Sequence, residues 1–157
     1  HAVRLEARPA TSDGLVAIEL VDLVRAALRL RPDRLIVGEF RGAEVLAAIQ
    51  AMNTGHDGSL STCHANSAAD ALRRVETLVM QAAPTWPLIA IRRQVSRSID
   101  VVVHLERDAG GRRVVTEISE VVESSDEPVV RRLVTNSAVE QRLTRGRRVA
   151  PTIGAIG

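Results

Sequence analysis

The sequence predicts an α/β fold with parallel strands, followed by an appended antiparallel β element. A short apolar run at residues 35–37, and a run of apolar and hydroxyl residues at 59–64, lie between helical segments, which is typical of buried parallel strands. Further along, residues 100–106 and 114–122 predict two strands joined by a hairpin turn at residues 110–111. The chain has 157 residues, enough for about one domain.

The first elements are expected to be a short strand, a loop and a helix. Residues 2–7 alternate in polarity and predict a strand, whereas residues 8–14 contain the Pro, Asp and Gly typical of a loop. In residues 20–30 the apolar side chains recur at helical spacing and form one stripe. Pro32 ends this helix because proline disfavours helical geometry in the residue before it.

Three more helices are expected after the first apolar strand. Residues 42–53 place their apolar side chains on one side of a helix. Ser67 and Asp70 form a pattern like a capping box, which begins a helix that continues to about residue 82. Residues 88–98 predict the last of the three.

The C-terminal part is expected to be antiparallel and to end in a basic tail. Residues 129–134 predict a third strand beside the hairpin, and the following residues predict a weak helix. The tail is expected to be solvated, or else to contact acidic lipid, nucleic acid or a neighbouring subunit. Its arginines are Arg142, Arg145, Arg147 and Arg148.

Composition favours a soluble cytoplasmic domain that belongs to something longer. No apolar run approaches the roughly 18–20 residues that span a bilayer, and no signal-peptide pattern begins the chain. Cys63 is the single cysteine, so no internal disulfide can form, as is usual in a reducing compartment. The first residue is His1 rather than Met, which favours a fragment of a longer protein.

All 21 basic residues are arginine. A phosphate-binding loop of the form GxxxxGK followed by Ser or Thr requires a lysine, so this chain cannot contain one.

One candidate catalytic residue is Glu39, which ends the apolar strand at residues 35–37. Ligands in open α/β sheets bind beyond the carboxyl ends of the strands, so Glu39 lies where a ligand would bind. A carboxylate there can hold Mg²⁺ directly or through water, or can orient an attacking water. The alternative is a solvated acid at a strand end.

Residues 55–66 form a second cluster, in which His64 follows a strand and should emerge at the same edge as Glu39. An imidazole there can donate to a phosphate oxygen. Three alternatives remain open: a zinc site of His56, Cys63 and His64, a Cys63–His64 nucleophile pair, and purely structural histidines.

Arginines are frequent in the helix and strand that lead to Glu39. A guanidinium is planar and permanently charged, which suits binding of phosphate or an arginine finger, although each could be an ordinary surface charge. These residues are Arg25, Arg29, Arg31, Arg34 and Arg41.

Together these segments resemble a known family. Residues 28–44 resemble the Walker B segment of type II and type IV secretion ATPases, and residues 50–66 resemble their His box. The run AMNTGHDGS followed by HAN is most similar to the CpaF branch, the ATPases of tight-adherence (Flp) pilus systems. Phe40 and Cys63 depart from the usual aliphatic residues of that branch without removing a chemical group.

The resemblance implies the C-terminal part of a RecA-like domain of the P-loop NTPase class. Residues 1–107 would belong to this core, with Walker B at residues 34–42 and the His box at residues 55–66. Residues 108–157 would form the appended hairpin, meander and basic tail. The phosphate loop would lie upstream, so the chain alone should not hydrolyse ATP.

The resemblance also implies the roles of individual residues. Catalysis would involve Glu39, which holds Mg²⁺ through water, with His64, His56 and Arg41. Nucleotide binding would involve Arg25, Arg29, Gly38 and Thr62.

At the level of the assembly, the resemblance implies a homo-hexamer that uses ATP and Mg²⁺. It would work in the cytoplasm at the inner-membrane face, on platform proteins of a pilus or secretion system, peripheral to the membrane and without direct binding of nucleic acid. Two alternatives compete with it. One is a truncated, non-catalytic interaction domain, and the other is a nucleic-acid-binding module suggested by the sequence pI of about 9.8 and the basic tail.

Overall fold

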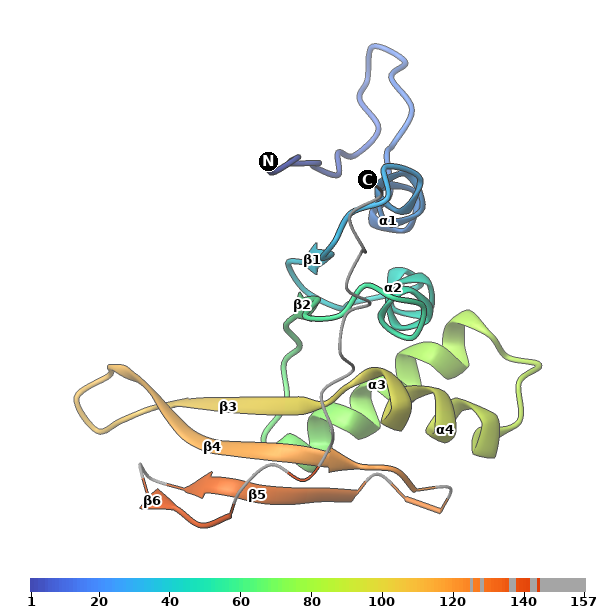
Figure 1. Cartoon of the computed structure of the whole chain (residues 1–157). Coiled ribbons are helices and arrows are strands. Elements are labelled where there is room, and N and C mark those ends of the chain that lie inside the picture. Colours follow the sequence, from blue (N-terminus) through green and yellow to red (C-terminus); the bar gives the residue numbers. More distant parts are fainter. Residues whose placement is uncertain (125, 128, 136–137, 142–143, 145–157) are drawn as a thin grey trace, which may run out of the picture.

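The computed structural model describes residues 1–124, 126–127, 129–135, 138–141 and 144. A helix precedes a parallel pair of short strands, and an antiparallel meander comes last, after two further helices (Figure 1). The elements are α1 (Leu20–Arg29), β1 (Ile36–Val37), α2 (Glu44–Met52), β2 (Leu60–Ser61), α3 (Ala68–Ala82), α4 (Leu88–Ser98), β3 (Val101–Arg107), β4 (Arg113–Val122), β5 (Val129–Thr135) and β6 (Ala138–Val139).

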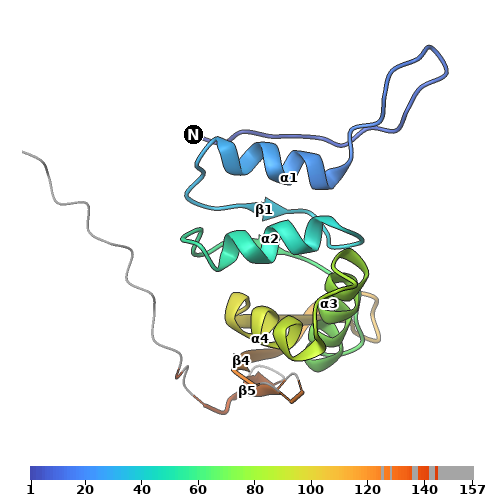
Figure 2. The same ribbon diagram turned by 90° about the vertical axis from the view of Figure 1, so that its right-hand side faces the viewer.

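Strands β1 and β2 pair in parallel, with Ile36 opposite Leu60 and Val37 opposite Ser61. Helices α1 and α2 lie on the same side of this pair (Figures 1 and 2). Val37 is buried, because one face of the pair packs on these helices. Ile36 is 73% exposed and Leu60 is 63% exposed, so the opposite face is not covered by the described residues.

Strands β3 to β6 form an antiparallel sheet in sequence order, and α3 contacts β3, β4 and β5. The β3–β4 turn is closed by Asp108, whose carboxylate accepts hydrogen bonds from the amides of Gly110 and Arg112 at 2.9 Å each. Gly111 follows with φ of 78°, a conformation in which glycine avoids the strain of a Cβ. The hairpin predicted at residues 110–111 is therefore confirmed.

One aliphatic core joins the two parts. It continues from α1 and the β1–β2 pair, through α2, α3 and α4, to Val121 of β4. Fully burying one aliphatic side chain contributes about 1.5–3 kcal/mol, so this core is the main source of stability. Its most completely buried members include Val45, Ile49, Leu72, Val79, Ile91 and Val95.

The four helices predicted within residues 20–98 are confirmed, as are the two parallel strands and the third antiparallel strand. Helix α3 begins where the capping pattern predicts, because the Ser67 hydroxyl accepts a hydrogen bond from the Asp70 amide at 3.1 Å. Strand β2 covers only two residues of the predicted 59–64, since β1 is equally short and offers no longer partner. The proposed division after residue 107 falls inside the β3–β4 hairpin.

Two expectations are wrong. Residues 2–7 form no strand, because their side chains are exposed and no neighbouring strand pairs with them; the only bridge nearby joins Arg8 to Ile18. Residues 138–139 form strand β6 instead of a helix, since they pair with the exposed edge of β5. The tail arginines Arg142, Arg145, Arg147 and Arg148 lie outside the described residues.

Candidate active site

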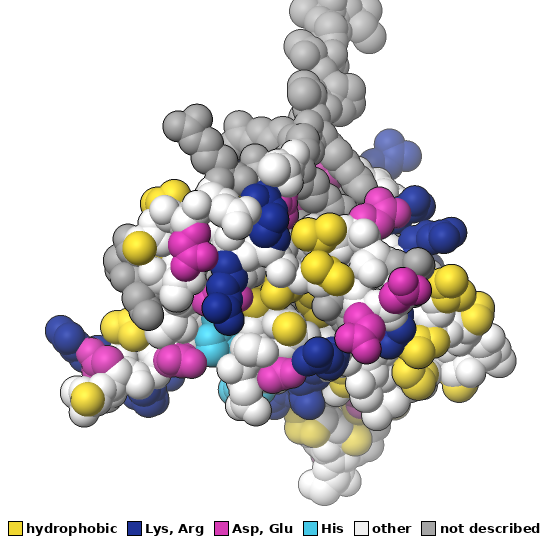
Figure 3. All heavy atoms as spheres, turned by 90° about the horizontal axis from the view of Figure 1, so that it is seen from below, with side chains coloured by type: hydrophobic (Ala, Val, Ile, Leu, Met, Phe, Trp, Pro, Cys, Tyr) yellow, Lys and Arg dark blue, Asp and Glu magenta, His cyan; other side chains and the backbone are white. Residues whose placement is uncertain are grey.

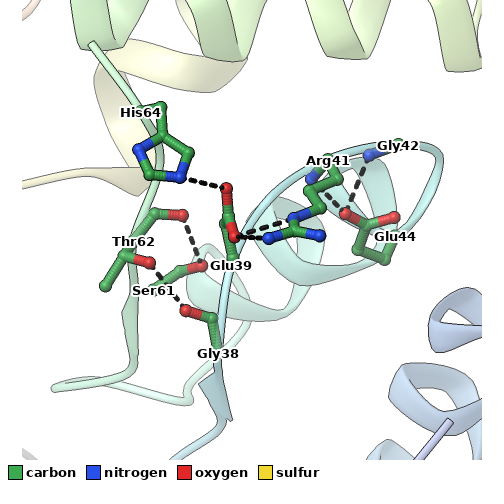
Figure 4. A network of polar contacts seen from close by, with 8 residues as sticks. All are labelled: Gly38, Glu39, Arg41, Gly42, Glu44, Ser61, Thr62 and His64. Atoms are coloured by element: carbon green, nitrogen blue, oxygen red, sulfur yellow. Dashed lines mark hydrogen bonds and ion pairs between the residues drawn. The ribbon is translucent and has the colours of Figure 1, made fainter.

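Glu39 and His64 meet just beyond the carboxyl ends of β1 and β2 (Figure 4). The His64 Nε2 atom lies 3.2 Å from the Glu39 Oε1 atom. This contact follows from the parallel pairing, because both strands then deliver the next residues to the same edge of the sheet. The structure thus brings together the carboxylate and the imidazole that the sequence placed at one edge.

Arg41 binds the other oxygen of the same carboxylate. Its Nε atom donates to Glu39 Oε2 at 2.7 Å, and its Nη2 atom lies 2.5 Å from that oxygen. The hydrogen bond from Arg41, with the charges of Arg41, His64 and Arg74, holds the pKa of Glu39 below its usual range against a smaller opposing effect of burial. Glu39 is therefore ionised at neutral pH.

The three side chains differ in exposure. The Glu39 side chain is only 20% exposed, whereas those of Arg41 and His64 are 75% and 86% exposed. A bound anion could therefore reach the guanidinium and the imidazole, with the carboxylate behind them. Such an arrangement suits phosphate binding by Arg41 and His64 and orientation of a water by Glu39.

Backbone contacts join the two loops that carry these side chains. The Thr62 hydroxyl donates to the Gly38 carbonyl at 2.7 Å, and the Phe40 amide donates to the Thr62 carbonyl at 2.8 Å. These bonds continue the pairing of β1 with β2 past the ends of both strands. Gly38 and Thr62, predicted as nucleotide-binding residues, thus hold the Glu39 and His64 loops side by side (Figure 4).

Glu44, the first residue of α2, binds the segment that follows Glu39. Its Oε1 atom accepts hydrogen bonds from the amides of Arg41 at 2.6 Å and Gly42 at 2.9 Å. Glu44 is 5% exposed. The sequence analysis missed this role, although an acidic residue in the first turn of a helix is a recognised signal for such contacts.

His56 lies away from this group. It precedes β2, whereas His64 follows it, so the two histidines lie toward opposite ends of the strand pair. The His56 Nδ1 atom is 3.1 Å from the carbonyl oxygen of Ala51, near the end of α2. His56 and Arg25 both line a separate cavity of about 420 Å³ along α1 and α2. The structure does not bring His56 or Arg25 into contact with Glu39.

The remaining arginines occupy different positions. Arg29 is exposed in the last turn of α1. Arg31 follows α1 with φ of 50°, and the Arg34 side chain packs over Gly58, where an added Cβ would lie 3.0 Å from the Arg34 Nε atom. Among the predicted arginines, Arg41 is the one in contact with the Glu39 carboxylate.

The metal and nucleophile alternatives find little support in the geometry. Within the part of the chain that the structure describes, no group of three or more His, Cys, Asp or Glu side chains is placed to hold a metal ion. Burial raises the pKa of the Cys63 thiol, which disfavours the thiolate that a nucleophile requires. Mg²⁺ needs fewer protein ligands, since it usually keeps waters and binds one or two carboxylates plus substrate phosphates. The single carboxylate of Glu39 fits that donor set.

The surface gives no sign of a basic nucleic-acid site on the face drawn in Figure 3. Basic and acidic side chains are interspersed there with apolar ones. Phosphate-backbone binding depends on clustered positive charge, which this face lacks. No helix among the described residues is both long and apolar enough to cross a membrane.

Solved structures identify the class of fold. The crystal structure of the VirB11 ATPase from the Brucella suis type IV secretion system superposes with a TM-score of 0.62 and 32% identity, covering 66% of this chain and 32% of that one. The Legionella pneumophila ATPase DotB gives a TM-score of 0.51 at 27% identity, covering 68% of this chain and 28% of that one. The fold is that of part of a RecA-like ATPase domain.

The chain belongs to the family described as "Type II/IV secretion system protein", whose model matches residues 2–153. A putative conjugal transfer protein of Mycobacterium tuberculosis is 42% identical over 119 residues, 76% of this chain and 33% of its own length. The type IV secretion system protein PtlH of Bordetella pertussis is 41% identical over 112 residues, 69% of this chain and 33% of its own length. The chain thus spans about a third of these relatives.

Proposed function

We propose that this chain provides the Walker B and His-box part of an ATP-hydrolysing motor subunit. The observation that carries the proposal is the convergence of Glu39 and His64 at the ends of two parallel strands, at 3.2 Å. An ionised carboxylate beside an exposed imidazole and an exposed guanidinium suits two parts of phosphoanhydride hydrolysis, the orientation of water and the stabilisation of charge on the phosphate.

In this proposal each side chain has a separate task. Glu39 orients the attacking water, and it would hold Mg²⁺ through a water molecule. Arg41 and His64 bind oxygens of the terminal phosphate, since their side chains are the exposed ones. Gly38 and Thr62 keep the two loops in register beneath the nucleotide. Mg²⁺ would supply charge neutralisation on the phosphates.

The other predicted residues are assigned a supporting role. Arg25 and His56 line the cavity along α1 and α2, and Arg29 is exposed at the end of α1. We place these three at contacts with a neighbouring subunit. Residues 1–107 would then hold the nucleotide-site elements, and residues 108–157 the appended β element and tail.

The assembly is proposed by analogy with the family. It is a homo-hexamer at the cytoplasmic face of the inner membrane that moves pilin or a secreted substrate through platform proteins. Relatives are named for type IV secretion and conjugal transfer. We propose the CpaF branch of tight-adherence (Flp) pilus ATPases on the AMNTGHDGS and HAN segments.

The decisive variant is Glu39→Gln in the full-length protein that contains this chain. Removing the charge while keeping the shape should lower kcat for ATP hydrolysis by about 10²–10⁴-fold and spare ATP binding, because only the step that uses the carboxylate is affected. Phosphate release measures kcat, and titration with a fluorescent nucleotide measures binding. Glu106→Gln is the matched control, since Glu106 is an exposed carboxylate on β3.

Unchanged kcat in Glu39→Gln would remove this residue from the reaction. A wild-type protein that binds its secretion partners without hydrolysing ATP would instead favour the non-catalytic interaction domain. The isolated 157-residue chain belongs in the same assay. We expect no turnover from it, since it has no lysine to hold the β- and γ-phosphates.

A further inference from the structure

Glu44 differs from an ordinary helix cap. A cap usually accepts from amides inside the first turn of its own helix. The Glu44 carboxylate reaches backwards, to the amides of Arg41 and Gly42, which precede α2. One of these amides belongs to the residue whose guanidinium binds Glu39.

The contact is strong and closely packed. An ionised acceptor makes hydrogen bonds shorter and stronger than neutral ones, and negative charge at a helix N-terminus is itself stabilised. A Cβ added to Gly42 would lie 3.3 Å from the other oxygen of Glu44, so glycine leaves room for the carboxylate. Glu44 is nearly inaccessible to solvent, which keeps water from replacing these bonds.

The segment between β1 and α2 is therefore held from two sides. Thr62 bonds Gly38 and Phe40 on the side of β2, and Glu44 bonds Arg41 and Gly42 on the side of α2. Glu39 lies between the two residues that Thr62 bonds, and Arg41, which binds its carboxylate, is held by Glu44 (Figure 4). When both sets of bonds are in place, Arg41 binds the Oε2 atom of Glu39, and the Oε1 atom is free to contact His64.

We propose that Glu44 is a positioning residue for the hydrolytic step, acting through the backbone of Arg41 and Gly42 to fix Arg41 against Glu39. This inference rests on the proposed ATPase function. Without Glu44 the loop loses its attachment on the α2 side. The Arg41 guanidinium and the Glu39 carboxylate then lose their fixed relation to the nucleotide, while the residues that bind the rest of the nucleotide are unaffected.

The test uses the full-length protein with three variants. Glu44→Ala removes both hydrogen bonds. Glu44→Gln keeps one carbonyl oxygen, and a single oxygen can accept both bonds because Oε1 alone does so in the wild type. Ser98→Ala is the stability control: Ser98 is buried and its hydroxyl bonds the Ile49 carbonyl at 3.0 Å, away from Glu39. The measurements are kcat and KM for ATP, the Tm, and hydrogen exchange of residues 39–43.

Glu44→Ala should lower kcat by about 10²-fold, the effect of a small misplacement of reacting groups, with KM changed by less than about threefold. Glu44→Gln should restore most of kcat. Amide exchange in residues 39–43 should speed up in Glu44→Ala and stay slow in Glu44→Gln. Ser98→Ala should lower the Tm and leave kcat unchanged.

Three results would overturn the inference: wild-type kcat in Glu44→Ala, equal losses of kcat in Glu44→Ala and Ser98→Ala, or no rescue by Glu44→Gln. A wild-type protein without turnover would refute the proposed function instead. In that case, faster exchange in Glu44→Ala would still support the attachment of the loop, and unchanged exchange would refute it.

Discussion

The strand-end site and the antiparallel meander of the same chain are stabilised by different kinds of contact. The meander pairs strands of seven and ten residues along almost their whole length and packs on α3. The site is built on strands of two residues. Its loops are joined by hydrogen bonds in which Ser59 and Glu44 accept from backbone amides and Thr62 donates to a carbonyl. The residues that stabilise the meander are therefore different from those that position the loops of the site.

The comparison extends to the apolar faces. Helices α3 and α4 cover one side of the meander, and Val121 is 2% exposed there. The β1–β2 pair is covered by α1 and α2 on one side only, which leaves Ile36 and Leu60 exposed. A region with fewer apolar contacts depends more on each polar contact. Removing a polar side chain near the site should therefore lower stability more than a similar substitution in the meander.

The largest loss of stability is expected from a substitution in the core shared by both regions. Leu72 of α3 is 1% exposed and belongs to this core. Leu72→Ala should lower the free energy of unfolding by about 2–5 kcal/mol, since it removes buried surface and leaves a cavity. Urea unfolding measures the change. Met80→Ala, at a position 43% exposed on the same helix, is the control; equal losses in both variants would contradict a shared core at Leu72.

A smaller loss is expected from the hydroxyl that connects the two short strands. Ser59 Oγ accepts from the Leu35 amide at 2.9 Å and donates to the His56 carbonyl at 2.6 Å. Ser59→Ala should cost about 1–3 kcal/mol, because the part-buried Leu35 amide loses its partner. Ser61→Ala, whose hydroxyl makes only an exposed 3.4 Å contact, should cost less than about 0.5 kcal/mol. Equal costs in urea unfolding would show that Ser59 does not join the strands.

The smallest expected change is a shift of the pH profile, which is separate from the loss of activity that removing Arg41 from the phosphate also causes. Arg41 is the main cause of the lowered pKa of Glu39, so Arg41→Ala should raise that pKa toward its usual value. Because its pKa is lowered, Glu39 stays ionised as the pH falls. In Arg41→Ala the carboxylate would become protonated at a higher pH than in the wild type. The acid limb of the profile of kcat/KM against pH should therefore move to higher pH. Arg112→Ala, which removes the partner of Asp108 in the β3–β4 turn, should leave the limb in place; an unshifted limb in Arg41→Ala would contradict the assignment.

Helices and turns were predicted correctly from the sequence where neighbouring residues along the chain carry the signal. Helix α1 follows its apolar stripe, α3 begins at Ser67, and the hairpin turns at residues 110–111. Prediction failed for residues 2–7, where alternation alone suggested a strand but none of the described residues forms a partner strand. Alternation is local, whereas a strand exists only with a neighbour to accept its hydrogen bonds.

The same division applies to the site. The meeting of Glu39 with His64 could be predicted, because parallel strands bring their carboxyl ends to one edge. The pairing of Arg41 with Glu39 could not, since it depends on the path of the loop between β1 and α2. The backward reach of Glu44 was missed, although an acidic residue in the first turn of a helix signals such contacts. The separation of His56 from His64 follows from the direction of β2 and was missed when both histidines were treated as one cluster.

By itself the sequence determined the four helices within residues 20–98 and the edge of the sheet at which Glu39 and His64 emerge. It also determined that no lysine-containing phosphate loop lies in this chain. The tertiary structure alone decided how Glu39 divides its two oxygens between Arg41 and His64, and which backbone amides Glu44 binds. Periodicity and capping are properties of neighbours along the chain. Hydrogen bonds between loops depend on distances that only the packed helices and strands establish.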